Sequence, residues 1–162
     1  MQQQDFAGHK TVWKICRYAN DEAFKRGEPY DISEFEGNLL LNEGITALQN
    51  LLIGAADASF GNANTYIGVG DSSATTAASQ TGLQAVTNKA YEAMEATYPQ
   101  ISSQTTTWRA IFESADANYA WREFTIVNAS TDAGDNLNRK VSAQGTKASG
   151  QTWTVDVSLT WS

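Results

Sequence analysis

Ten consecutive residues near the end of the chain place a bulky apolar side chain at every second position. From residue 152 to 161 they read Thr-Trp-Thr-Val-Asp-Val-Ser-Leu-Thr-Trp. Successive side chains of a β-strand point to opposite faces, so this alternation predicts a strand with one buried face and one wet face. We therefore expect an antiparallel β-protein whose apolar side chains are used for packing.

Further segments alternate in the same way, and loops rich in Gly, Ser, Thr, Asn and Asp separate them. The predicted strands cover residues 12–18, 65–70, 104–112, 119–127, 137–143 and 152–161. Residues 83–95 fit either a weak helix or an extended edge strand. The spacing of the turns predicts a mainly β fold, an antiparallel β-sandwich or a jelly-roll-like variant of it.

One segment has helical spacing instead. Ile45, Leu48, Leu51 and Leu52 recur at intervals of three and four residues, and Gly54 follows them. The pattern predicts one amphipathic helix over about 42–53, with Asn42 as its N-cap and its apolar face packed on a sheet.

The first thirty-six residues differ from the rest, because they hold five of the eleven basic and seven of the eighteen acidic residues. A short helix or turn is expected over 20–26. One interpretation makes 1–36 an N-terminal arm that docks on a neighbouring subunit, with 37–162 as the sandwich domain. The other makes it the first strand and loop of the same domain.

The net charge is −7 and the pI is about 4.6. Nucleic-acid binding and attachment to a membrane surface both need clustered basic residues, and here these are scattered. Cys16 is the single cysteine, so no disulfide can form within the chain, and we expect a small buried hydrophobe there. No apolar run approaches the ~20 residues of a membrane span, and no secretory signal is visible at the start. Assembly in a cytoplasm is expected.

The sequence offers little for catalysis. Nucleophilic catalysis by Ser or Cys needs a base, and His9 is the single histidine. The carboxylate pairs Glu92 with Glu95 and Glu113 with Asp116 have the residue types for glycoside hydrolysis. Neither pair has an obvious apolar pocket around it, so we interpret both as surface charge.

Two motifs resemble ligand sites only superficially. Residues 68–71, Gly-Val-Gly-Asp, lack the remaining residues of a dinucleotide or P-loop fingerprint. Asp132, Asp135 and Asn136 are suitable calcium ligands, but their spacing is not that of an EF-hand. No catalytic residue, cofactor or metal is predicted.

The five tryptophans allow either core packing or a sugar-binding groove. Trp108, Trp153 and Trp161 lie on the apolar side of alternating strands, which favours the core.

The order of several motifs resembles small structural proteins of tailed bacteriophages. Asn-Leu-Leu-Leu-Asn-Glu-Gly at 38–44 leads into the helix, and Tyr-Ile-Gly-Val-Gly-Asp-Ser-Ser follows at 66–73. Then come Gln-Thr-Gly-Leu at 80–83, Ala-Trp-Arg-Glu-Phe at 120–124 and Leu-Asn-Arg-Lys at 137–140. The pattern covers 38–162 and is similar to tail-fibre and collar modules and to stand-alone proteins that decorate capsids.

The resemblance implies a non-enzymatic virion protein, a capsid decoration (cement) protein that binds the outer capsid surface and stabilises the head. Its expected partners are the major capsid protein and copies of itself, as a homotrimer or other small oligomer. The arm would then be a clamp, and Trp13, Tyr18, Phe24 and Tyr30 its partner-binding residues. A tail-fibre, collar or baseplate component remains an alternative, and so does a carbohydrate-binding module.

Overall fold

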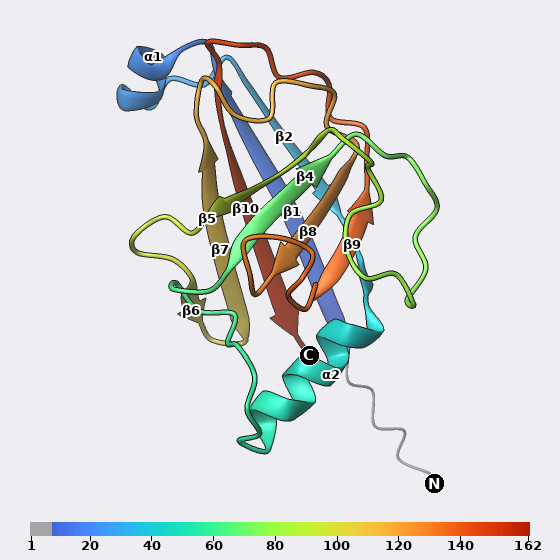
Figure 1. The fold of residues 1–162 in the computed structure, drawn as a ribbon. Coiled ribbons are helices and arrows are strands. Elements are labelled where there is room, and N and C mark those ends of the chain that lie inside the picture. Colours follow the sequence, from blue (N-terminus) through green and yellow to red (C-terminus); the bar gives the residue numbers. More distant parts are fainter. Residues whose placement is uncertain (1–7) are drawn as a thin grey trace, which may run out of the picture.

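In a computed structural model, which describes residues 8–162, the chain is an antiparallel sandwich of two five-stranded sheets (Figure 1). The first sheet has the order β2-β1-β10-β7-β6, formed by Asp31–Glu36, His9–Tyr18, Thr152–Trp161, Thr105–Phe112 and Gln100–Ser102. The second has the order β3-β9-β8-β4-β5, formed by Leu39–Leu40, Asn138–Val141, Glu123–Val127, Tyr66–Gly70 and Lys89–Ala93. The helices are α1 (Asp21–Lys25) and α2 (Asn42–Leu52). The predicted fold class is confirmed.

The C-terminal strand β10 is the centre of the first sheet, paired with β1 on one side and β7 on the other. As its alternation predicts, Trp153, Val155, Val157 and Leu159 face the core and are at most 2% exposed. Trp161 does not follow them and is 41% exposed. Beyond Leu159 the strand faces α2 across a hollow that Leu40 of β3 also lines, so the ring is only partly covered. Its expected place in the core is therefore wrong.

The described part of the segment 1–36 is not a separate arm. β1 pairs with β10 over ten residues, from His9 opposite Trp161 to Tyr18 opposite Thr152. On its other side β1 pairs with β2. Trp13 and Ile15 on its inner face are fully buried, so the strand is part of the core. The second interpretation, a first strand of the same domain, describes residues 9–36, and residues 1–7 lie outside the described part.

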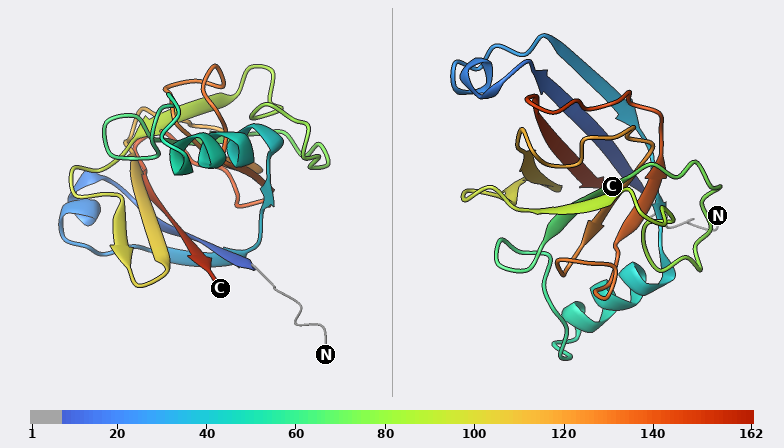
Figure 2. Two further views of the ribbon diagram at one scale, coloured as in Figure 1. Left: turned by 90° about the horizontal axis from the view of Figure 1, so that it is seen from below. Right: turned by 45° about the horizontal axis from the view of Figure 1, so that its top comes forward.

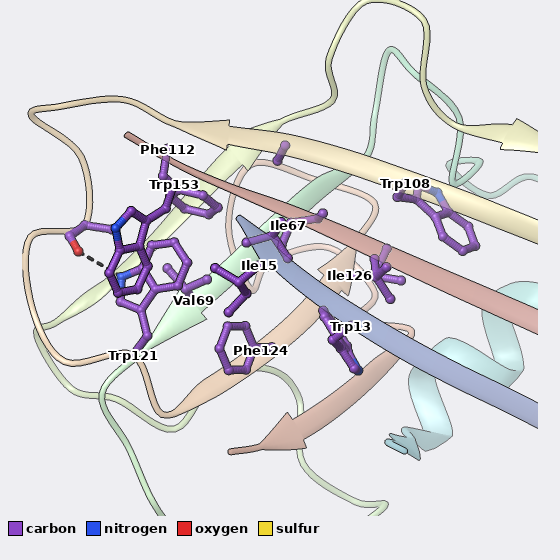
Figure 3. Close-up of a cluster of buried hydrophobic side chains, with 14 of the residues drawn as sticks. Trp13, Ile15, Ile67, Val69, Trp108, Phe112, Trp121, Phe124, Ile126 and Trp153 are labelled. Atoms are coloured by element: carbon purple, nitrogen blue, oxygen red, sulfur yellow. Dashed lines mark hydrogen bonds between the residues drawn. The ribbon is translucent and has the colours of Figure 1, made fainter. Parts of the chain in front are cut away.

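The core is a cluster of large rings between the two sheets (Figure 3). The Trp121 ring lies 4.8 Å from both Phe112 and Trp153, edge to face in each case. Its indole N–H donates to the carbonyl of Ala117 at 2.9 Å, so the polar atom of the buried ring has a partner. Core packing is confirmed for Trp13, Trp108, Trp121 and Trp153. Cys16 is only partly buried, because it lies on the outward side of β1.

Helix α2 forms where predicted but packs differently. Its N-cap is Leu41, with no side-chain hydrogen bond, and not Asn42. The buried residues are Gly44 and Ala47. A Cβ at Gly44 would come within 2.5 Å of the Leu137 backbone, so the helix rests on the sandwich through its small residues. The leucine-rich face is therefore only partly covered, since Leu48 packs against the core whereas Leu52 is 86% exposed.

Figure 1 places α1 and α2 at opposite ends of the sandwich, and Figure 2, seen from below, shows α2 crossing the end where β10 finishes. Three short or edge strands, β2, β3 and β6, were not predicted. Within the segment 83–95, for which a weak helix or an extended edge strand was expected, Lys89–Ala93 form the edge strand β5.

Candidate binding surfaces

An apolar groove lies between α2 and the end of β10, and we call it the α2 groove. Its lining residues are His9, Leu40, Ile45, Leu48, Gln49, Leu52 and Trp161, around a hollow of about 330 Å³. None of these side chains is a carboxylate, a lysine or an arginine. The ten residues from 44 to 53 and the six from 157 to 162 also contain no charged side chain. The groove is thus an uncharged surface on a chain of net charge −7.

Trp161 is held in place by strand pairing on both sides. Its backbone N–H donates to the Gln104 carbonyl at 3.1 Å. Gly8 and Ser162 exchange backbone hydrogen bonds of 2.7 and 3.0 Å beside it. The His9 ring lies 5.9 Å from the indole. The backbone that carries the exposed ring is therefore held before any partner binds, and on its other side the ring borders a second hollow with Gly8, Gln104 and Ser162.

A second exposed apolar surface lies at the α1 end, and we call it the aromatic patch: Tyr18, Phe24, Tyr30 and Ile32. The Tyr18 and Phe24 rings meet edge to face at 5.2 Å. Tyr30 and Ile32 are 54% and 51% exposed. The structure thus brings together three of the four residues predicted to bind a partner.

The prediction that Trp13, the fourth of these residues, binds a partner is wrong. Trp13 is fully buried, stacks on Phe35 at 6.2 Å and donates its indole N–H to the Gly37 carbonyl at 3.2 Å. The signal that separates it from Tyr18 is present in the sequence. Trp13 lies two residues before Ile15 on β1, so both side chains point to the same, inner face. Tyr18 lies three residues after Ile15 and therefore points to the opposite face, away from the core.

Arg17 positions the aromatic patch from below. It is 6% exposed, donates to a carboxylate oxygen of Asp31 at 2.8 Å and lies 4.7 Å over the Trp153 ring. The Tyr30 N–H donates to the Arg17 carbonyl at 2.8 Å. These contacts fix the start of β2 beside β1 and with it the exposed Tyr30 and Ile32.

The motifs at 66–73, 80–83, 120–124 and 137–140 meet at a buried polar cluster beneath the strap, our name for residues 71–88 between β4 and β5. Glu123 and Arg139 form an ion pair at 2.7 Å with both side chains fully buried. The Glu123 carboxylate accepts the backbone N–H groups of Gln84 and Ala85 at 2.9 and 2.7 Å. Arg139 donates to the carbonyl of Ala74 at 2.9 Å.

Gly70 makes room for this cluster, because a Cβ there would lie 2.5 Å from a Glu123 carboxylate oxygen. The Gly-Val-Gly-Asp run that resembles a phosphate loop therefore accommodates a carboxylate of the chain itself. The motifs hold the strap on the outer face of the second sheet and do not form an exposed site. Sequence reasoning missed this pairing, since nothing local links Glu123 to Arg139.

The carboxylates considered for catalysis do not converge as pairs. Glu95 lies 3.8 Å from Arg109, and Asp116 accepts the Glu113 backbone N–H at 3.1 Å. Glu92 stands apart from these contacts. Burial, together with the nearby Asp116 and Glu113 carboxylates, raises its pKa to about 7.

Lys147 lies near this acidic turn and was also missed. Its ammonium donates to the carbonyls of Glu113 and Asp116 and to Asn118 Oδ1 at 2.6, 2.8 and 2.8 Å. Burial lowers its pKa. All three donors have acceptors, so the side chain acts as a clamp on the turn 113–118.

The calcium interpretation also fails on geometry. Asp132 accepts from Lys89 at 2.9 Å and from the Leu83 N–H at 3.2 Å, and Asn136 is buried against Thr125. Across residues 8–162 no three His, Cys, Asp or Glu side chains are grouped to hold a metal.

Comparisons with protein-family models, with curated proteins and with solved structures found no match to this chain. Within the described residues, neither helix has the length and apolar character needed to cross a membrane.

Proposed function

We propose that the chain is a non-enzymatic structural protein of a tailed-phage virion, a decoration protein that binds the outer capsid surface and stabilises the head. The observation that carries the proposal is that the sandwich leaves apolar side chains in water at both ends although its core is closed. Such surfaces mark contacts with other proteins. The motif order at 38–140 supports the phage assignment.

In this proposal the aromatic patch contacts the major capsid protein. The patch consists mainly of large aromatic rings, which often dominate the binding energy of protein interfaces, and the two tyrosines also offer a hydroxyl group for hydrogen bonding. Each contact contributes modestly, but an oligomer that engages several capsid subunits at once gains through multivalency. The negative net charge keeps decorated particles soluble.

The test is the copy number of the chain in purified particles, measured by quantitative mass spectrometry with the major capsid protein as internal reference. A decoration protein occurs in a fixed ratio to the capsid protein. Particles that contain none of the chain would refute the virion assignment. Replacing Tyr30 by Ser should lower occupancy, whereas Val86→Ser, at a still more exposed position on the strap, should not.

The first alternative, a tail-fibre, collar or baseplate component, predicts a few copies per particle and a location at the tail by electron microscopy.

The second alternative, a carbohydrate-binding module, is favoured by Trp161, whose half-exposed ring lies beside Gln104 and Ser162. Aromatic rings can stack on sugars, and the two polar side chains can hydrogen-bond hydroxyls. The other four tryptophans are buried, so a fluorescence response to a glycan that disappears in Trp161→Phe would support this function.

A further inference from the structure

We infer that the α2 groove is the surface through which two copies of this chain bind each other. The inference deepens the self-association in the proposed function by naming the surface, and it rests on that function only for its biological setting. The physical argument stands on the exposure, charge and rigidity of the groove.

The exposure is large for a surface with no partner. Leu52 and Ile53 project from the end of α2 with 86% and 78% of their area in water, and Ile45 and Trp161 are 40% and 41% exposed. Burial of apolar surface is worth roughly 25 cal/mol per Å². The surface offers both projecting side chains and a hollow beside them, so two copies can fill each other's hollows.

The net charge of the chain, together with the absence of charged side chains in the groove, favours a second copy as the partner that binds there. Two chains of net charge −7 repel each other, and the repulsion is smallest where they meet through an uncharged surface. The groove is such a surface. The aromatic patch is not uncharged, because the ion pairs Arg26–Glu28 and Arg17–Asp31 lie beside it, and Glu34 is exposed there as well. A partner that required opposite charge would be attracted there and not to the groove.

The groove is also rigid on both sides. α2 is fixed against the Leu137 backbone by the close approach at Gly44, and Trp161 is fixed by pairing with His9 and by the bond to Gln104. Association therefore costs little additional ordering of the backbone.

The experiment measures the mass of the full chain in solution by light scattering and sedimentation velocity over a wide concentration range. We expect the unmodified chain to form an oligomer that dissociates on dilution. Leu52→Lys, which places like charges in the contact, should be monomeric throughout. Val86→Lys is the matched control, because it adds the same charge at a residue 91% exposed on the strap, and it should associate as the unmodified chain does.

Thermal unfolding and circular dichroism of both variants check that they fold; Leu52 makes too little contact with the core for its replacement to unfold the chain. The inference is overturned by a monomeric unmodified chain, by an oligomer that survives Leu52→Lys, or by equal loss in Val86→Lys. A monomeric chain that still occurs at high copy number in particles would refute this inference alone. An oligomer that is absent from particles would refute the proposed function alone.

Discussion

Glu92 is a carboxylate on the inward side of an edge strand. In β5 it lies opposite Ile67 of β4, a fully buried residue, so the register turns its side chain toward the core side of the sheet. Asp116 and Glu113 add negative charge nearby, and Lys147 offsets part of it. Its pKa of about 7, against an ordinary 4.5, means that the folded chain binds this proton more tightly than the unfolded chain.

Glu92 should therefore destabilise the fold as pH rises from about 4.5 to 7, and fully above that range. We expect Glu92→Gln to stabilise the chain by about 1 kcal/mol at pH 8, a value reduced for partial solvent screening. At pH 4 the change should be close to zero. Urea unfolding at both pH values measures it, with Glu22→Gln on exposed α1 as control for loss of one negative charge. Equal effects at the two pH values would contradict the assignment.

At the scale of elements, side-chain periodicity identified most strands and α2, because alternation and 3.6-residue spacing are local properties. It did not identify which face of α2 docks. That is decided by how closely the backbones approach, and Gly44 permits an approach that a side chain at its position would prevent. The acidic edge strand β2 was missed for a related reason. Its single well-packed apolar residue, Phe35, becomes apparent only opposite Trp13.

Gly44→Ala tests the docking of α2. The new Cβ would meet backbone atoms of Leu137 at 2.5 Å, and backbone cannot move aside as a side chain can. We expect a loss of about 1–3 kcal/mol despite the higher helix propensity of Ala. Gly54→Ala also acts at a special position, with a positive φ of 71° but open space around it. Gly54→Ala should lower the free energy of unfolding by about 1 kcal/mol, because it adds backbone strain and no steric clash. A stabilised Gly44→Ala variant would refute the close docking.

The strap depends on the buried ion pair, and this pairing could not be predicted from the separate motifs that form it. Arg139→Met should destabilise the chain by about 3–5 kcal/mol, since it leaves the Glu123 carboxylate buried without its partner. Hydrogen exchange at the Gln84 and Ala85 amides should also accelerate. Lys140→Met is the control one residue away, where the ammonium is exposed and donates to the Glu36 carbonyl. Unchanged protection of the two amides in Arg139→Met would show that other contacts hold the strap.

At the scale of the whole molecule, the chain is a closed sandwich with an apolar surface at each end. Strand alternation assigns Trp13, Trp108 and Trp153 to the core, whereas Trp161 lies on the same face of β10 as Trp153 and is exposed because it borders the hollow beside α2. The alternation of side chains along a strand predicts which face of the sheet a side chain points to. It does not predict whether another layer of the protein packs against that face. The candidate surfaces are therefore the part of the molecule that needed the structure, while its β-sandwich class did not.

The distribution of charge makes a final prediction about association. A contact made of ion pairs weakens as salt screens it, whereas an uncharged contact between two chains of net charge −7 strengthens as salt screens their long-range repulsion. The Debye length falls from about 30 Å at 0.01 M to about 8 Å at 0.15 M salt. Self-association through the α2 groove should therefore tighten between these two salt concentrations. Sedimentation equilibrium measures the dissociation constant at each condition, and weaker association at the higher salt would point to a contact between charged surfaces instead.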